Sequence, residues 1–496
     1  MSPSNPSPAA LRARALAVAA IPTAVTLVLF FARLHLFPIG GDEPHYLVMA
    51  RSLLTDRDLD LKNNYETDES YSRIRPHVYA QPRGWMPYHG AGLSFLIAPF
   101  LAIGGETGVR IGLPVFTGLL AWALFRWLAP MAGAGVAGRT VAGVMLCVPI
   151  LFGSMQIYPD LPAGVVATAL TCWLLTRAGE TTMDREPAEP AKIPGSAHSA
   201  VSAVSALIVT RGPTRAWPLF WLASGLLPWL NPKFAPATMV FALGGGALAG
   251  RLRVAGRRSE AVQAAWTLPL VAAGPILLAA FNLWAFGSIV GARGLDELTR
   301  SPARASMIFL GLHLDQSQGM FLLQPLLLAG VAALVPFARQ RPRAALFCGA
   351  LYLSLIVPNA LELARYGLSG PAGRFAWSAM WLWIIPMGFA LASYRSVAAR
   401  WVRPVVAAAI VYQSALAIRW IAAPQVLLTS VDEPRDSLFG APLAPWLPSF
   451  YTWDFVSYLY NPINQTAIVI VVLLVAAGAY ASREERATHR ASATGG

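Results

Sequence analysis

The chain has 496 residues, of which 56% are apolar and 13% are charged, and its mean hydropathy is +0.52. Soluble domains carry about 25% charged residues, so this composition indicates a membrane protein. The 38 Lys and Arg residues outnumber the 25 Asp and Glu residues, which gives a formal charge of +13. The basic residues are scattered among short loops between apolar runs, as the positive-inside rule predicts, and this argues against a nucleic acid partner.

The N-terminal segment predicts a membrane anchor. Residues 1–14 contain Arg12 and Arg14 and precede an apolar run over 15–36. This run is longer than the core of a signal peptide, and no small-residue cleavage site follows it, so we expect an uncleaved span. The three cysteines lie in apolar runs without metal-ligand spacing and are interpreted as small core residues: Cys147, Cys172 and Cys348.

Apolar runs of about 20 residues predict roughly twelve membrane-spanning helices. They are expected at 15–36, 109–129, 140–157, 161–178, 216–230, 234–250, 264–286, 319–337, 345–363, 375–393, 404–423 and 464–481. The fold class predicted is therefore an all-α polytopic integral membrane protein. One transmembrane domain would cover 15–481, between a cytoplasmic N-terminus at 1–14 and a cytoplasmic tail at 482–496.

A further apolar stretch at 91–105 decides which side each loop faces. If it lies in the interface without crossing, four arginine clusters join Arg12 and Arg14 on the cytoplasmic side, which the positive-inside rule favours. The loops at 37–108 and 424–463 are then exterior, and the Ala-, Pro- and Ser-rich loop at 179–215 is cytoplasmic and expected to be disordered. The clusters are Arg251/Arg253/Arg257/Arg258, Arg339/Arg341/Arg343, Arg395/Arg400/Arg403 and Arg483/Arg486/Arg490.

The first exterior loop opens with the adjacent carboxylates Asp42 and Glu43, followed by Pro44 and His45. Ionised groups at a membrane surface are functional candidates. Asp42 could accept a proton from a hydroxyl nucleophile. It could equally cap the helix predicted after Pro44, and the two roles are compatible.

Other polar groups are expected on the same exterior face. Asp160 could cap the following helix or act as a second carboxylate beside Asp42. Lys233 could snorkel to the interface or contact a phosphate. Arg110 and Arg374 lie at exterior ends of spans, and the Gly-rich turn before Arg374 could let its guanidinium fold over a phosphate. Asp315 could be a site residue or only a helix cap.

The motifs resemble the GT-C glycosyltransferases, in the branch that holds protein O-mannosyltransferases and lipid A aminoarabinose transferases. The resemblance is carried by Gly41-Asp-Glu-Pro-His-Tyr46 and Pro87-Tyr-His-Gly90. It continues through Gly108-Val-Arg110, Tyr158-Pro-Asp160, Asn231-Pro-Lys233 and Gly373-Arg374. It implies a GT-C-like fold with juxtamembrane helices in the first exterior loop.

The resemblance also implies an inverting sugar transfer from a polyprenyl-phosphate donor to a hydroxyl of a lipid, glycan or protein, at the outer face of the cytoplasmic membrane. Asp42 would be the base, supported by Glu43 or Asp160. The phosphate would be held by Lys233, Arg110 and Arg374. We expect His45, His89, Tyr158 and Asp315 to contact sugar or acceptor. No cofactor is required, although a divalent cation on Asp42, Glu43 and Asp160 stays open.

Two other classes of protein compete with a transferase. A lipid-linked sugar flippase or other transporter usually has ionisable groups near the membrane midplane and repeated halves. Here charges within the predicted spans are scarce and no internal repeat is evident. A membrane scaffold would leave the acidic loop without a purpose. The sequence therefore favours the transferase.

Overall fold

The computed structural model describes residues 8–33, 39–67, 74–179, 216–291, 298–363, 366, 370–429, 438–440, 442–450 and 460–494. The disorder expected for the 179–215 loop concerns residues that lie almost wholly outside these ranges. The described part is predominantly helical, with two small two-stranded sheets.

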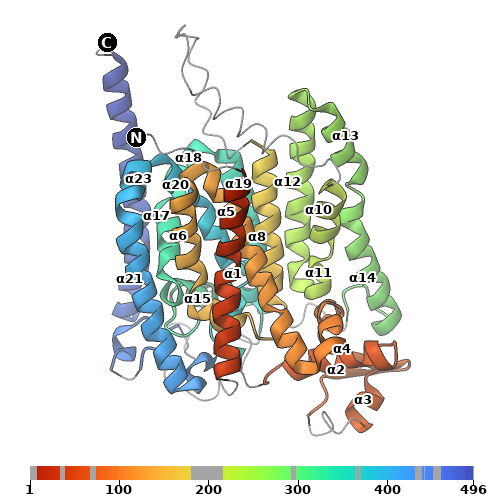
Figure 1. Cartoon of the computed structure of the whole chain (residues 1–496). Helices are drawn as coiled ribbons and strands as arrows, with labels where there is room; N and C mark the ends of the chain where they lie inside the picture. Colours follow the sequence, from red (N-terminus) through yellow and green to blue (C-terminus); the bar gives the residue numbers. More distant parts are fainter. Residues whose placement is uncertain are drawn as a thin grey trace.

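The N-terminal third begins with one long helix of the bundle, continues through short helices and a hairpin at one end of the bundle, and then returns to bundle helices (Figure 1). Its helices are α1 (Pro8–Ala32), α2 (Glu43–Thr55), α3 (Lys62–Thr67), α4 (Gly92–Gly112), α5 (Pro114–Ala132), α6 (Ala134–Met145), α7 (Val148–Gly153) and α8 (Asp160–Arg177). The strands β1 (Val78–Gln81) and β2 (Gly84–Pro87) form an antiparallel hairpin between α3 and α4.

The middle and C-terminal parts complete the bundle. The middle part contains α10 (Ala216–Gly225), α11 (Leu227–Leu230), the 3-10 helix η2 (Pro232–Phe234), α12 (Ala235–Val254), α13 (Arg258–Thr267), α14 (Leu270–Phe286) and α15 (Pro302–Leu314). Next come α16 (Met320–Leu323), η3 (Pro325–Leu327), α17 (Leu328–Ala332), α18 (Leu334–Gln340) and α19 (Pro342–Leu361). The last part contains β3 (Gly370–Pro371), η5 (Arg374–Ala376), η6 (Met380–Trp383), α20 (Ile384–Ser393), α21 (Arg395–Ala422), η7 (Pro424–Leu427), β4 (Leu428–Thr429), η8 (Ala444–Trp446) and α23 (Pro462–Thr494).

Seven helices in the described ranges are long and apolar enough to cross a membrane, so this is a multi-pass helical membrane protein. They cover Ala9–Ala32, Gly92–Gly112, Pro114–Ala132, Arg258–Phe286, Pro342–Leu361, Arg400–Ala422 and Pro462–Ala481. Several of the twelve expected spans are divided into shorter helices instead, so the number twelve stays a prediction. The expected 319–337 span, for example, consists of α16, η3, α17 and α18, and Pro325 and Pro336 lie within it.

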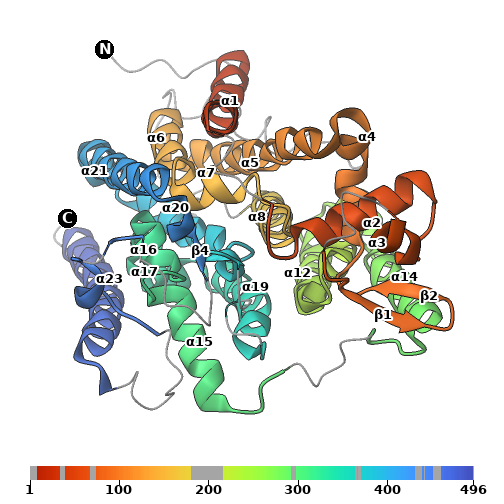
Figure 2. The same cartoon turned by 90° about the horizontal axis from the view of Figure 1, so that it is seen from below.

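The helix α4 is long enough to cross but lies across the end of the bundle. Seen from below, α4 is viewed lengthwise while α8 and α12 are viewed nearly end-on (Figure 2). Gly104 and Gly105 interrupt it with non-helical backbone angles, and the φ of Gly105 is +60°. This direction is the one expected for a segment that follows the interface without crossing.

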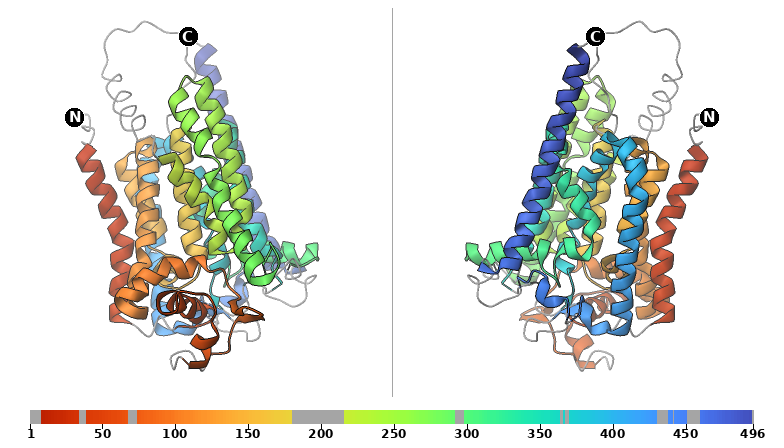
Figure 3. Two further views of the ribbon diagram at one scale, coloured as in Figure 1. Left: turned by 90° about the vertical axis from the view of Figure 1, so that its right-hand side faces the viewer. Right: turned by 90° about the vertical axis from the view of Figure 1, so that its left-hand side faces the viewer.

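The bundle has two different ends. Both chain termini, α13 and α18 lie at one end, and α2, α3 and the β1–β2 hairpin project from the other (Figures 1 and 3). The α12–α13 junction carries one of the arginine clusters. The positive charges predict that the arginine clusters and the acidic first loop lie on opposite sides. In the structure this arginine cluster and the first loop lie at opposite ends of the bundle.

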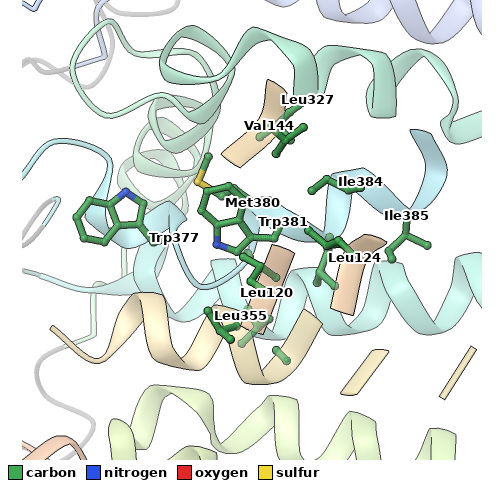
Figure 4. Packing of buried hydrophobic residues seen from close by; sticks show 14 of the residues in the cluster. Leu120, Leu124, Val144, Leu327, Leu355, Trp377, Met380, Trp381, Ile384 and Ile385 are labelled. Atoms are coloured by element: carbon green, nitrogen blue, oxygen red, sulfur yellow. The ribbon is translucent and has the colours of Figure 1, made fainter. Parts of the chain in front are cut away.

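The centre of the bundle is packed around the segment that follows η5. Trp377, Met380 and Trp381 are almost fully buried, and Trp381 lies beside leucines of α5 and α19 (Figure 4). Helix α8 approaches this segment so closely that a Cβ on Gly164 would lie 2.3 Å from the carbonyl oxygen of Trp377. Small residues at such crossings let membrane helices pack backbone to backbone. This contact holds the first turn of α8 beside η5, where Arg374 lies.

Candidate active site

Asp42 is placed by the turn that starts α2. Gly41 adopts a φ of +56°, which glycine tolerates without strain, and Pro44 occupies the first turn of the helix. Asp42 is the N-cap residue, but its side chain makes no capping hydrogen bond. Its backbone N–H instead donates to the Tyr158 hydroxyl at 3.3 Å. The carboxylate therefore faces the interior of the site rather than the end of its own helix.

The surroundings of Asp42 favour its ionised form. Its Oδ2 accepts a hydrogen bond from Arg374 Nη1 at 3.2 Å, and its Oδ1 lies 3.9 Å from His89 Nε2. Burial would raise the pKa of Asp42, but the Arg374 guanidinium and then His89, His45 and His77 outweigh burial and hold that pKa below its usual value. The side chain keeps 30% of its surface exposed. It is thus a charged carboxylate that a ligand can reach.

Arg374 joins the two carboxylates of the site. It begins η5 directly after Gly373, whose φ of +71° turns the chain inward. Its guanidinium lies over the Tyr158 ring at 4.3 Å, and its Nε is 4.0 Å from Asp160 Oδ2. The Tyr158 hydroxyl in turn donates to the Gly40 carbonyl at 3.2 Å. Arg374 is therefore held between Asp42, Asp160 and an aromatic face.

Asp160 and Lys233 form a second ion pair beside Arg374. Asp160 is the first residue of α8, and its Oδ1 lies 2.6 Å from Lys233 Nζ, without hydrogen-bond geometry. Asn231 shapes the η2 turn by accepting a hydrogen bond from the Lys233 backbone N–H at 3.1 Å. Lys233 Nζ also lies 4.3 Å from the centre of the Phe375 ring. The lysine thus turns into the protein and does not snorkel.

Glu43 and Arg110 form a separate buried pair. Glu43 accepts hydrogen bonds from the backbone N–H groups of Ile157 at 2.7 Å and Gly40 at 3.0 Å. Arg110 Nη2 lies 3.7 Å from Glu43 Oε2, and its Nη1 donates to the Met155 carbonyl. Burial raises the pKa of Glu43 to about 6 against the opposing effects of Arg110 and the backbone donors. Arg110 contacts Glu43 and not the two carboxylates of the site, so its expected phosphate contact has no support in this geometry.

Three histidines lie on the other side of Asp42. The His45 ring stacks on His77 with centroids 4.0 Å apart, and His77 Nδ1 lies 3.3 Å from His89 Nε2. His45 Nδ1 is 2.6 Å from the Tyr65 hydroxyl. Burial, and then the neighbouring His77, lower the pKa of His45 to about 4, with Asp42 opposing them. The expected site residues His45 and His89 are thus brought together with Asp42.

Asp315 has a structural position away from this group. Its Oδ1 accepts hydrogen bonds from the backbone N–H groups of Ser317 and Gln318, and its Oδ2 accepts one from Phe450. Both oxygens are engaged and the residue is fully buried. Burial raises the pKa of Asp315 while these three donors oppose the rise. Asp315 therefore ties the 315–319 turn to the 450 region, and its expected sugar contact remains without structural support.

His77 is a site neighbour that the sequence interpretation missed. In the β1–β2 hairpin Val78 pairs with Pro87, which places His77 beside Tyr88 and His89. The signal was two short strand-like runs separated by two residues, with Gly84 opening the second. The hairpin is fastened by Asp60, whose Oδ1 accepts a hydrogen bond from the Trp85 backbone N–H at 2.7 Å. Asp60 thus has a structural role in this loop.

The carboxylates expected to hold a cation do not converge in one place. Glu43 faces Arg110, Asp160 faces Lys233, and Asp42 faces Arg374 and His89. Among the described residues, the group whose ligand atoms do converge is Asp42, His77 and His89, all within 4.8 Å of one another.

These observations define a multi-pass helical membrane protein with a cluster of ion pairs at the end opposite to its termini. No protein-family model matches the chain, and no curated protein matches it in sequence. Among solved structures the chain is similar to ArnT from Cupriavidus metallidurans, crystallised with undecaprenyl phosphate. The two share 15% identity with a TM-score of 0.44, over 93% of this chain and 75% of ArnT.

Proposed function

We propose that the protein is a membrane glycosyltransferase that moves a sugar from a polyprenyl-phosphate-linked donor to a hydroxyl of a lipid, glycan or protein. The reaction would take place at the exterior face of the cytoplasmic membrane. The observation that carries the proposal is the row Asp42–Arg374–Asp160–Lys233. It combines a reachable carboxylate with two cations at one end of the bundle.

The two cations suit the phosphate of a lipid-linked donor. Two carboxylates, Asp42 and Asp160, face two cations, Arg374 and Lys233, so the described pairs balance in charge. A guanidinium and an ammonium group are the side chains that bind phosphate oxygens most strongly. The lipid tail of such a donor stays in the bilayer, where it can lie against the apolar outer surfaces of the spans. The phosphate would therefore enter between these cations from the membrane side.

The proposed transfer is a single displacement. The acceptor oxygen attacks the anomeric carbon of the sugar, and the bond between that carbon and the phosphate oxygen breaks. The electron pair leaves with polyprenyl phosphate, whose increasing negative charge Arg374 and Lys233 would stabilise. The hydroxyl proton passes to Asp42, and attack from the opposite face inverts the anomeric configuration. Because Asp42 is ionised at neutral pH, it can accept the proton as the attacking hydroxyl becomes acidic.

The test is the release of free polyprenyl phosphate from a panel of polyprenyl-phosphate sugars by purified protein in lipid–detergent micelles. Wild type should release it when membrane extract supplies acceptors, and the sugar that supports release identifies the donor. Asp42→Asn should lower the rate roughly 100-fold or more, the usual contribution of a base. Glu66→Gln, which removes an exposed carboxylate of α3, is the matched control and should keep the wild-type rate.

Two results would contradict the proposal. An Asp42→Asn protein as active as wild type would refute the role of Asp42. A folded wild type that releases nothing from any donor would refute the transferase itself and favour transport of the lipid-linked sugar, which a flipping assay in vesicles would then measure.

A further inference from the structure

Three potential metal-ligand atoms meet on the side of Asp42 that faces away from Arg374. His77 Nδ1 lies 3.3 Å from His89 Nε2, and His89 Nε2 lies 3.9 Å from Asp42 Oδ1. All three ligand atoms are within 4.8 Å of one another. They come from the start of α2, the residue before β1 and the segment after β2. The hairpin thus brings residues together that are up to 47 positions apart, from 42 to 89.

The spacing of these atoms is close to that of a zinc site. Zinc binds imidazole nitrogen and carboxylate oxygen at about 2.0–2.2 Å, so neighbouring ligands of a tetrahedral site are roughly 3.4 Å apart. The pair of imidazole nitrogens already has this separation. The other separations require side-chain rotations that move the ligand atoms by roughly 1 Å.

The surroundings hold the three groups in position. His45 stacks on His77, and its own Nδ1 contacts the Tyr65 hydroxyl, so the stack is fixed from behind. The His89 side chain is only 6% exposed. Arg374 engages Asp42 Oδ2 and leaves Oδ1 directed toward His89. Groups that orient a ligand through its second atom are typical of metal sites in proteins.

We propose that Asp42, His77 and His89 bind one divalent transition-metal ion of the Zn²⁺ class. Two imidazoles and one carboxylate suit such an ion, whereas Mg²⁺ and Ca²⁺ prefer oxygen ligands throughout. Three protein ligands leave the fourth tetrahedral position open to water or to an oxygen of another molecule. Because Asp42 is also the base of the proposed transfer, a bound metal and a free Asp42 carboxylate exclude each other. That last consequence rests on the proposed function, but the metal site does not.

Metal binding is measured without any transfer reaction, so failure of this inference is distinguishable from failure of the proposed function. The full-length protein is purified with an affinity tag that contains no histidine, stripped with a chelator, and titrated with Zn²⁺. Bound zinc per chain is counted by elemental analysis after desalting. Wild type should hold one equivalent, and His77→Gln and His89→Gln should each weaken binding at least about tenfold. His198→Gln, outside the described residues, is the control for the loss of a histidine and should bind as wild type does.

The wild-type protein loaded with Co²⁺ gives a reading that needs no variant. The proposed site should produce the intense visible absorption of four- or five-coordinate cobalt, and this result stands if a histidine variant does not fold. A wild type that binds less than one equivalent, or shows only octahedral cobalt, would overturn the inference. So would folded His77→Gln and His89→Gln proteins with wild-type affinity, because the zinc would then be an adventitious ion only.

Discussion

Neighbouring carboxylates in one motif have different surroundings in this protein. Asp42 faces Arg374 and keeps part of its surface exposed, whereas Glu43 is enclosed by Arg110 and two backbone donors. The direction of each side chain follows from the helix start, where successive residues point about 100° apart. Asp42 can therefore meet a ligand, while Glu43 fastens the first loop to the segment before α8.

Substitutions in the Lys233–Asp160 pair distinguish a role in phosphate binding from a role in folding stability. Lys233→Gln leaves the buried Asp160 carboxylate short of a cation, and such a loss typically costs about 3–5 kcal/mol. Arg374 remains near Asp160, so the lower end of that range is expected. We expect Lys233→Gln to lower both the melting temperature in detergent and the release of polyprenyl phosphate.

The double variant Lys233→Gln/Asp160→Asn is the control for this prediction. Removing both charges should recover most of the melting temperature but not the activity, because the phosphate would still lack its ammonium partner. If the double variant regained the wild-type release rate, Lys233 would have only a structural role.

Folding stability should depend on pH through His313, which is not one of the residues of the candidate site. Its Nδ1–H donates to the Phe309 carbonyl and its Nε2 accepts from the Tyr352 hydroxyl, which satisfies the neutral ring. Burial lowers the pKa of His313 to about 4, from 6.5 in the unfolded chain, while the Phe309 carbonyl opposes the change. The unfolded state therefore takes up a proton as the pH falls below about 6.5 and the folded state does not. Stability contributed by His313 is lost as the pH falls from 6.5 toward 4.

The measurement compares wild type with His313→Gln. Between pH 7 and pH 5 wild type should lose on the order of 1–2 kcal/mol more stability than the variant, from the difference in proton uptake. Melting temperatures in one detergent across this pH range supply the comparison. Parallel curves for the two proteins would show that the folded His313 ring takes up a proton as readily as the unfolded one.

The sequence predicted the chemistry of the site better than its contacts. Asp42, Asp160, Lys233 and Arg374 lie together, as expected from loops on one face. Arg110 and Asp315 were grouped with them because a loop position shows which face a charge occupies but not which partner it meets. His77 was missed because its proximity to His89 arises from hairpin register, which short runs with a proline specify weakly.

At the scale of elements, the close approach of α8 to the 374–381 segment sets the distance between Asp160 and Arg374. A methyl group on Gly164 would lie 2.3 Å from the Trp377 carbonyl oxygen and 3.1 Å from the Ser378 Cα. We expect Gly164→Ala to push α8 outward, to lower the melting temperature and to reduce transfer several-fold. The measurement is thermal unfolding together with the release assay.

Gly349→Ala is the matched control for Gly164→Ala. Gly349 lies in α19 with no atom within 4 Å of an added Cβ, and alanine favours a helix by up to about 1 kcal/mol over glycine. Its melting temperature should be equal to or above that of wild type. Equal melting temperatures and equal release for Gly164→Ala and Gly349→Ala would contradict a spacing role for Gly164.

Hydropathy located most of the apolar runs, but it predicted neither their ends nor the interruptions within them: the run expected at 404–423 belongs to α21, which begins at Arg395. Hydropathy averages over about 20 residues, so it does not distinguish one continuous helix from short helices joined by turns. The expected 140–157 span is divided into α6 and α7 by Leu146 and Cys147, with Pro149 in the first turn of α7. The same limit applies to 375–393, which contains η6 before α20.

At the scale of the whole molecule, the predicted sidedness places the chain termini and the 179–215 loop in the cytoplasm. A cysteine introduced at Ser196 should be shielded from a membrane-impermeant thiol reagent in intact cells. A cysteine at Glu66, on the exposed surface of α3, should react readily. The three native cysteines are buried, which keeps the background low. Ready labelling at 196 together with protection at 66 would reverse the orientation.

The hydrogen bond between Asp42 and Arg374 joins residues that are 332 positions apart. A ribosome delivers the two carboxylates and the lysine to the membrane long before it delivers the arginine. Until then Asp42 and Asp160 would repel each other without the cation that lies between them. The charge pairing of this site is therefore complete only after the segment around η5 has been inserted. A chain whose synthesis stops before residue 374 would carry an unneutralised acidic centre, and quality-control proteases should degrade it faster than a chain that stops after α21.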